Sequence, residues 1–263
     1  MWTLLNKANL VFWATFLCCF AIKVQAQTQP LNVVTLEYPP YIFDNQGKVD
    51  GMATKVVEEA FHRLQIPIEI QILPWARAIH KLRFGQADAI YTIFKNQERM
   101  MFADYSSQIL FQQSIALFTS SGRQIDFNGQ LSDLSDYSFC VVIGVSYGKK
   151  FDEAVKSGKL NKIFETRSAR QCLQLLLKKR VDIWINNHFG GLAIANAESS
   201  LSKIHVVTSS VQSTPSYIAF SKLNNHQGIR DKLDQVLQQM KQDGTYQKIV
   251  ESFIGPQKNI ALP

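Results

Sequence analysis

WARAIHKLRFGQADAIYTIFKNQER, the sequence of residues 75–99, contains the pattern on which the predicted fold depends. Its first half has apolar residues at helical spacing, which predicts a helix, and Gly85 marks the turn after it. Residues 89–93 then predict a short buried strand, followed by a polar turn that ends at Arg99. An arginine just beyond a strand can direct a fork of N–H donors at a carboxylate. We therefore predict one wall of a ligand site at the end of this stretch.

The sequence before this stretch predicts the same alternation of strands and helices. Isoleucines at every second position between residues 66 and 72 are typical of a strand. Alternating strands and helices predict a parallel sheet with helices on its faces. The expected order is a strand at 32–37, a polar loop at 44–51, a helix at 56–64 and a strand at 66–72, followed by the helix and strand of the quoted stretch.

The pattern restarts in the second half of the chain, after extended sequence at 102–118. Ser168 is a candidate N-cap for one of its helices. The chain is long enough for two lobes with separate cores. The expected elements are strands at 139–143, near 162–165, at 181–185, 204–207 and 217–221; helices that begin near 149 and at 169; a loop or short helix at 188–198; and two helices after residue 228.

Residues 1–26 have the features of a secretory signal peptide. Lys7 gives a positive start, residues 10–22 form an apolar core, and a Val-Gln-Ala exit follows. The core is shorter than the roughly 20 residues that a membrane-spanning helix needs. Cys18 and Cys19 lack the preceding small residue of a lipoprotein site. We therefore expect a soluble periplasmic protein that is secreted through this peptide and is not lipid-anchored.

The charge of the chain argues against nucleic acid as a partner. The formal net charge is +7, and removing the leader takes away Lys7 and Lys23 but no acidic residue, which leaves +5. The basic residues are scattered, and no nucleic-acid-binding motif accompanies them. A dispersed positive surface predicts only mild attraction to anions.

Two cysteines, Cys140 and Cys172, remain after the leader. In an oxidising compartment an isolated pair is expected to form a disulfide, with a catalytic thiol as the alternative. The five histidines are dispersed, and no Cys/His spacing suggests a metal site. We expect neither a metal nor a cofactor.

Three further stretches resemble a known family over nearly all of residues 30–255. They are LEYPPYIF with GMATKVVEEAF behind it, GQADAIYTIFKNQERMMFADYS, and the C-terminal run from PSYIAF to ESFIG. Together they resemble the family 3 extracellular solute-binding proteins, the periplasmic receptors of polar amino-acid ABC transporters. The resemblance implies an α/β fold of the type II periplasmic-binding class, with lobe 1 at 28–115 and 212–263, lobe 2 at 118–209, and two crossover strands between them.

The resemblance also implies a mechanism and partners. The protein would be a monomer that captures a small solute with a carboxylate, an amino acid or a related compound, by hinge closure between the lobes. It would deliver this solute to an inner-membrane ABC permease, or alternatively report it to a membrane sensor. It would not be an enzyme.

The site residues of lobe 1 follow from the same resemblance. Arg99 matches the arginine that grips the ligand carboxylate, and Tyr41 matches the aromatic residue that stacks on the ligand, with Tyr38 beside it. Thr92 and Ile93 lie where the family has a small hydroxyl and backbone donors. Trp75 adds an aromatic wall or packs in the core.

Two positions in lobe 2 complete the expected site. Ser146, Tyr147 and Gly148 match the turn whose N–H groups and following helix hold a carboxylate. Asn187 matches the position where amino-acid binders have an aspartate for the ligand's ammonium group. Because Asn carries no negative charge, a dipeptide-like, cyclic or anionic ligand becomes an alternative to an ordinary amino acid.

Two enzymatic alternatives remain open at the level of the sequence. The run Gly144-Val145-Ser146-Tyr147-Gly148 also fits the G-x-S-x-G motif of a serine hydrolase, which would need a histidine near the serine. Periplasmic cyclohexadienyl or arogenate dehydratases are similar to this family as well. Such an enzyme would need an acid or base in the cleft, and Glu37 is the nearest candidate in the sequence.

Overall fold

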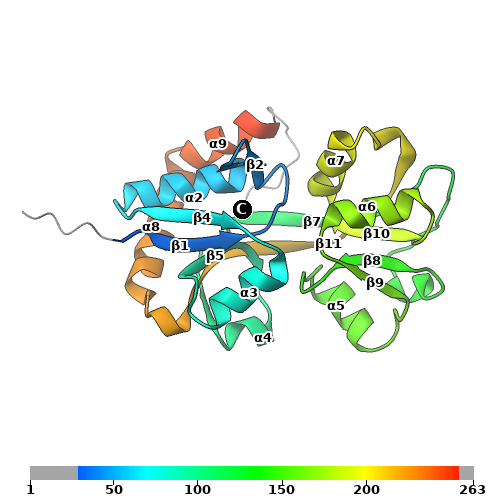
Figure 1. Cartoon of the computed structure of the whole chain (residues 1–263), viewed down its shortest axis with the longest axis horizontal. Coiled ribbons are helices and arrows are strands. Elements are labelled where there is room, and N and C mark those ends of the chain that lie inside the picture. The colour runs from blue at the N-terminus through cyan, green and yellow to red at the C-terminus, as the bar shows by residue number, and fades with distance from the viewer. Residues whose placement is uncertain (1–28, 255–263) are drawn as a thin grey trace, which may run out of the picture.

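Two α/β lobes share one continuous mixed sheet in the computed structural model of the chain, which describes residues 29–254 (Figure 1). The strand order is β4-β1-β5-β11-β7-β10-β8-β9, with β6 paired to β11. The predicted α/β class and two-lobe architecture are therefore confirmed. The predicted signal peptide at 1–26 lies outside the described residues. Within the described residues, no helix combines the length and the apolar character that crossing a bilayer requires.

Lobe 1 has helices on both faces of its part of the sheet. The helices α2, α8 and α9 share one hydrophobic core with one face, and α3 packs against the other. Its strands are β1 (Leu31–Thr35), β4 (Ile68–Ile72), β5 (Ala89–Phe94) and β6 (Ala103–Tyr105), and its helices are α2 (Met52–Arg63), α3 (Trp75–Arg83), α4 (Gln97–Met100), α8 (Gln227–Gln242) and α9 (Thr245–Ile254), with the short turn η3 (Lys222–Asn224) before α8.

The central strand β5 changes phase partway along its length. Ala89 and Tyr91 belong to the core beneath α2, whereas Ile90 belongs to the core beneath α3. Strict alternation would place Ile93 with Tyr91, but Ile93 packs on the α3 side. The register with β11 shifts at this point, which makes Thr92 the extra residue of a β-bulge. The bulge re-aims the end of β5 toward the junction of the lobes.

A small hairpin, β2 (Phe43–Asn45) and β3 (Lys48–Asp50), stands where the sequence predicted a polar loop at 44–51. Its turn forms because Gly47 adopts a left-handed backbone with φ 87° and donates its N–H to the Asp44 carboxylate at 2.7 Å. The alternation of side chains in so short a ribbon is too weak to indicate strands in advance.

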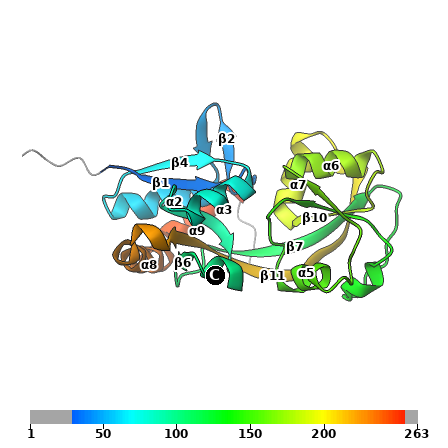
Figure 2. The same cartoon turned by 60° about the horizontal axis from the view of Figure 1, so that its bottom comes forward.

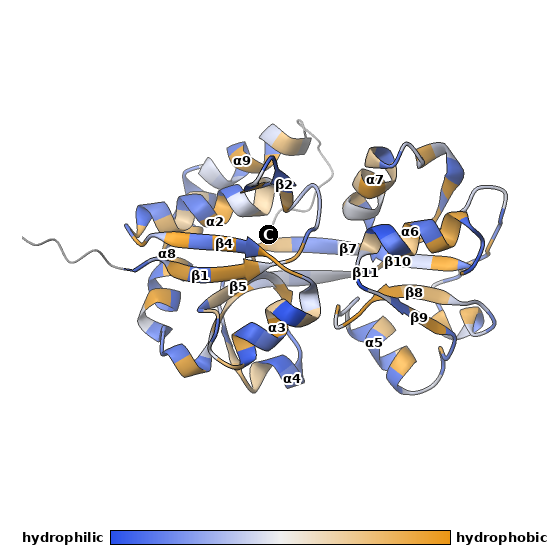
Figure 3. Cartoon of the chain, in the orientation of Figure 1, coloured by the Kyte–Doolittle hydropathy of each residue, from blue (hydrophilic) through white to orange (hydrophobic). Residues whose placement is uncertain are grey.

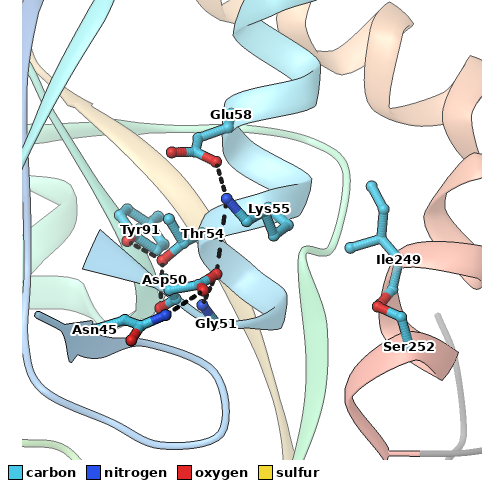
Figure 4. A network of polar contacts seen from close by, with 9 residues as sticks. All are labelled: Asn45, Asp50, Gly51, Thr54, Lys55, Glu58, Tyr91, Ile249 and Ser252. Carbon is cyan, nitrogen blue, oxygen red and sulfur yellow. Dashed lines mark hydrogen bonds and ion pairs between the residues drawn. The ribbon is translucent and has the colours of Figure 1, made fainter. Parts of the chain in front are cut away.

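The hairpin leads into α2 through a close backbone contact. Gly51 lies at φ 118°, and a Cβ there would sit 2.4 Å from the Tyr41 carbonyl oxygen. The same carbonyl accepts the N–H of Ala53 at 2.9 Å. One turn further on, the Thr54 hydroxyl contacts the Tyr91 hydroxyl at 2.9 Å, which ties α2 to β5 (Figure 4). These contacts fix the aromatic turn at Tyr41 to the sheet.

Lobe 2 repeats the layered arrangement, with α5 on one face of its strands and α6 and α7 on the other. Figure 3 shows apolar colour along β8, whereas α5 and α6 carry apolar and polar residues on different faces. The elements are η1 (Leu131–Leu134), β8 (Phe139–Val142), α5 (Lys149–Lys156), β9 (Ile163–Thr166), α6 (Ala169–Leu177), β10 (Ile183–Asn187), α7 (His188–Ala197) and η2 (Leu201–Lys203).

Two long antiparallel strands, β7 (Phe111–Ser120) and β11 (Ile204–Ser221), connect the lobes (Figure 2). They pair with each other, and each continues into the sheets of both lobes. The sequence predicted two separate strands at 204–207 and 217–221, but the structure has one. Residues 212–216 of its polar middle segment pair with β7, and two register shifts between Val206 and Gln212 lie beside the core of lobe 2.

The disulfide predicted from the sequence is present between Cys140 and Cys172, with a Cα–Cα distance of 5.4 Å. Both residues are fully buried, and the bond joins β8 to α6 within the core of lobe 2. The two residues are 32 positions apart. The bond therefore restricts a substantial loop of the unfolded chain.

Replacing both cysteines (Cys140→Ala with Cys172→Ala) should lower the free energy of unfolding by about 3–4 kcal/mol, because the unfolded chain gains loop entropy. Urea denaturation of the oxidised wild type and the double variant measures this difference. Equal stabilities, or two free thiols in non-reducing mass spectrometry of the exported protein, would contradict the assignment.

Candidate functional site

A cavity of about 310 Å³ lies between the lobes, beside the crossover strands. Its volume is at the small end of the range for ligand sites, roughly 300–1,000 Å³. Its wall is mostly apolar and aromatic. Lobe 1 and β7 contribute Leu36, Glu37, Tyr38, Pro39, Ile72, Leu73, Pro74, Trp75, Thr92, Phe94, Arg99, Gln113 and Ile115, and lobe 2 contributes Val142, Val145, Ser146, Tyr147, Arg167, Ser168, Ala169, Arg170, Asn186, Asn187, Ile194 and Ala197.

Arg99 bridges the two lobes at the wall of this cavity. It lies on α4, which replaces the polar turn expected from the sequence, because the Asn96 side chain caps the helix by accepting the Arg99 N–H at 2.8 Å. Its guanidinium donates to the Phe94 carbonyl of lobe 1 at 3.0 Å and to the Gly144 carbonyl of lobe 2 at 2.9 Å. It also lies 5.6 Å from the centroid of the Trp75 ring.

The charge of Arg99 has no ionic partner within the described residues. The residue is only 5 % exposed, and burial lowers the pKa of its guanidinium. Arginine nevertheless stays charged in proteins. A buried guanidinium whose hydrogen bonds go to carbonyl oxygens and not to a carboxylate favours a nearby anion, because an unpaired buried charge is costly.

Thr92, the bulge residue of β5, reaches the cavity in a strained conformation. Its φ is 61°, which is rare for a β-branched residue, and its hydroxyl donates to the Tyr91 carbonyl at 2.6 Å. Such backbone strain is frequent where a strand presents groups to a ligand.

Tyr38 lines the lobe 1 side of the cavity, and Tyr41 packs behind it. The rings of Tyr38 and Tyr41 stack with their centroids 5.1 Å apart. The Tyr38 hydroxyl donates to the Gln113 side-chain oxygen at 2.8 Å, and the Gln113 amide donates to the Ser216 hydroxyl at 2.9 Å. This chain fixes the orientation of the Gln113 amide. Burial raises the pKa of both tyrosines, so they stay neutral donors.

Two asparagines end β10 and form the lobe 2 side. The Asn187 side-chain oxygen caps α7 by accepting the Gly190 N–H at 2.8 Å, and its amide group faces the Tyr41 hydroxyl at 3.5 Å. The Asn186 side-chain oxygen accepts the Asn187 N–H at 2.9 Å, while its amide nitrogen is buried without a hydrogen-bond partner. The Asn187–Tyr41 contact is a second polar bridge between the lobes.

The turn at Ser146 is bonded within lobe 2. Asp152, in the first turn of α5, accepts the Tyr147 N–H at 3.0 Å and forms a short hydrogen bond with the Ser146 hydroxyl. The Ser146 oxygen in turn accepts the Gly148 N–H at 3.3 Å. Asp152 therefore occupies donors that the sequence assigned to a ligand carboxylate.

Seven of the ten ligand-binding residues expected from the sequence line the cavity, namely Tyr38, Trp75, Thr92, Arg99, Ser146, Tyr147 and Asn187. The other three are not among its lining residues. Tyr41 is 3 % exposed behind Tyr38, Ile93 is fully buried in the core beneath α3, and Gly148 caps α5. Tyr147 also serves the core of lobe 2, where its hydroxyl accepts the Val142 N–H at 2.9 Å.

Sequence reasoning missed three polar residues of the wall. Gln113 is 1 % exposed, and it was hidden in the extended stretch 102–118. Its signal was the two-residue spacing from the apolar Phe111 and Ile115, which puts all three side chains on one face of an extended strand. Asn186 lies at the end of β10, and Arg167 lies between β9 and α6. Both are positions where α/β sheets commonly place ligand contacts.

A second, polar cavity of about 490 Å³ is lined by α3 and α4 of lobe 1 and by the turn at Gly144 of lobe 2. Arg99 and Ser146 reach both cavities, whereas Asp152 and Glu165 line only the second. The bond from Arg99 to the Gly144 carbonyl forms part of the wall between them.

A serine hydrolase would need a histidine near Ser146, and a dehydratase would need an acid or base in the cavity. The Ser146 hydroxyl pairs with Asp152, and no histidine is among the described residues that line the interlobe cavity. Glu37 does line this cavity, but its side chain is exposed to solvent.

Comparison with known proteins places these features in a family. The model of the bacterial extracellular solute-binding proteins, family 3, matches residues 31–256. The chain belongs to this family. The family predicted from the sequence motifs is therefore confirmed.

Individual relatives of this family 3 protein are distant. The probable amino-acid-binding protein YxeM of Bacillus subtilis (strain 168) is 19% identical over 216 residues, covering 81% of this chain and 79% of the relative. An ancestral arginine-binding protein bound to arginine has a TM-score of 0.76 at 23% identity and covers 87% of this chain and 99% of its own. A histidine kinase sensor domain with similarity to periplasmic binding proteins has a TM-score of 0.77 at 18% identity, with 86% and 96% covered. These likenesses show the fold.

The free energy of unfolding of the Asp152→Asn variant should fall less with rising pH than that of the wild type. Burial raises the pKa of Asp152 above the ordinary value of 3.8, so the folded state binds this proton more tightly than the unfolded chain. Above that ordinary value, the wild type therefore loses stability as the carboxyl ionises with increasing pH. Asparagine can keep both hydrogen bonds without a charge. Urea denaturation at a series of pH values should show the variant gaining stability relative to the wild type as pH rises; parallel profiles would contradict this.

Proposed function

We propose that this protein binds a small solute through a carboxylate in the cavity between its lobes. The observation that carries the proposal is the buried, unpaired guanidinium of Arg99 at the wall of that cavity. An arginine presents two parallel N–H donors, which match the geometry of a carboxylate. Tyr38, which is backed by Tyr41, and Trp75 provide flat apolar surface for the rest of the solute.

Capture proceeds by closure of the lobes about β7 and β11. These strands are the hydrogen-bonded connections through which the sheet passes from lobe to lobe. A ligand that touches both walls stabilises the closed arrangement, in which Arg99 bonds to Gly144 and Asn187 faces Tyr41. The equilibrium shifts by the difference in affinity between the two states.

The partner in this proposal is an inner-membrane ABC permease, and the protein works as a periplasmic monomer after removal of residues 1–26. Support comes from the family membership and from the export features of the leader. A membrane sensor would use the same closed, loaded surface. We assign no catalytic step, because the Ser146 hydroxyl is engaged by Asp152.

Arg99→Ala should weaken the binding of a carboxylate ligand by at least about tenfold, because a charge-assisted hydrogen-bonded pair is lost. A thermal-shift screen of amino acids, small peptides and organic acids identifies the ligand, since a compound that binds only the folded state raises its stability. Calorimetry with that compound then compares wild type and variant.

Arg77→Ala is the matched control. Arg77 also lies on lobe 1, on the exposed side of α3, and is not among the residues that line the cavity. Its loss should leave the affinity unchanged. Equal affinities for wild type and Arg99→Ala, or equal losses in both variants, would refute the role of Arg99.

A further inference from the structure

We propose that the ligand of the interlobe cavity is a carboxylic acid without an α-ammonium group, carrying an apolar or aromatic body. This inference rests on the proposed function and specifies its ligand class. It follows from the polar atoms on the cavity wall, from the charges around it and from the apolar surface that remains.

The buried polar atoms without partners on this wall are hydrogen-bond donors. The indole nitrogen of Trp75 and the amide nitrogen of Asn186 are buried and unpartnered, and these two side chains are 4 % and 5 % exposed. The guanidinium of Arg99 has five N–H donors, of which the structure engages one on each terminal nitrogen. Three donor groups from two lobes thus belong to residues that line one cavity. A carboxylate, which only accepts, satisfies them.

The side-chain amide oxygens on the same wall are already engaged. Asn187 uses its oxygen to accept the Gly190 N–H, and Asn186 uses its oxygen to accept the Asn187 N–H. The Gln113 oxygen accepts the Tyr38 hydroxyl. This orientation is fixed because the Ser216 hydroxyl donates its proton to the Phe111 carbonyl at 3.1 Å and can therefore only accept from the Gln113 amide. An ammonium group needs up to three acceptors. Each of these three amide oxygens already accepts one hydrogen bond, so an ammonium group would have to share it with a protein donor.

The charged residues around the cavity also favour an anion. The described lining contains three arginines and one carboxylate, and among the arginines Arg99 is buried whereas Arg167 and Arg170 are exposed. Arg170 is paired with Glu198 at 3.2 Å, and the carboxylate, Glu37, is exposed to solvent. A buried ammonium near Arg99 would therefore meet its positive charge, and the partly buried carboxylate in electrostatic contact with Arg99, that of Asp152, is bonded to Ser146 outside this lining.

The rest of the wall suits an apolar body. Ile72, Phe94, Ile115, Val142 and Ile194 come from both lobes and from β7, and they face the same space as Tyr38. Burial of apolar ligand surface against such residues provides the main attraction beyond the carboxylate. A body the size of a phenyl or isobutyl group is compatible with a cavity of about 310 Å³.

Calorimetry with matched acids tests the inference on the wild-type mature protein. The probes are 3-phenylpropanoate against L-phenylalanine, and 4-methylpentanoate against L-leucine, which differ only in the α-ammonium group. We expect at least one of the two deaminated acids to bind, and to bind at least about tenfold more tightly than its amino acid, because the ammonium would be desolvated without acceptors.

The possible failures are distinguishable. Tighter or equal binding of the amino acids would overturn this inference and leave the carboxylate site standing. Binding of none of the four probes would overturn the apolar body. The proposed function itself fails only if the broad screen finds no carboxylate whose affinity depends on Arg99.

Asn187→Asp provides the converse test. Aspartate caps a helix as well as asparagine does, so α7 should be retained, and the variant adds a buried negative charge beside the cavity. The affinity ratio of L-phenylalanine to 3-phenylpropanoate should rise at least about tenfold. Asn161→Asp adds the same charge at an exposed position outside the cavity lining and should leave the ratio unchanged. An unchanged ratio in Asn187→Asp would refute the role of this position.

Discussion

The buried guanidinium of Arg99 couples the two lobes to each other and to the cavity. Desolvation of a charge is expensive, and only part of that cost is offset by the carbonyls of Phe94 and Gly144 and by the nearby Trp75 ring. Separation of the lobes would break the bond to Gly144 and return the charge to water. An anion in the cavity would instead compensate the charge where it lies. The balance between open and closed arrangements therefore depends on what stands beside this one side chain.

The surrounding fold fixes Arg99 and its neighbours through local backbone devices. The bulge at Thr92 redirects the end of β5, and the Asn96 cap starts the short helix that carries Arg99. On the opposite wall, Asn187 ends β10 and caps α7 with the same side chain. Thr92 lies near the end of β5, Asn96 follows that strand, and Asn187 is the last residue of β10. The cavity therefore lies at strand ends, where α/β proteins commonly bind ligands. The rigidity of these devices preorganises the donors.

Much of this arrangement could be predicted from local sequence patterns. Helical and strand periodicity, turn residues and the Ser168 cap are encoded within short windows, and they predicted the α/β order and the place of Arg99 beyond a strand. The expectation that Trp75 and Asn187 belong to the site came from the resemblance to the family. Gln113 could not be placed, because its role depends on where a crossover strand passes between lobes. Likewise, the single strand β11 exists only through its pairing with β7, and the engagement of Ser146 by Asp152 depends on the side-chain geometry of one helical turn.

The order of strands in the shared sheet has a consequence for synthesis. Strand β5 lies between β1 and β11, so its neighbour on one side arrives only with residues 216–220, more than 120 positions later. Lobe 2 lies almost wholly between these two segments of chain and can acquire its core first. Until the chain is nearly complete, lobe 1 presents an unpaired, apolar edge at β5, and such edges invite pairing with other chains. Vectorial emergence of this protein therefore leaves lobe 1 open to such pairing for longer than lobe 2.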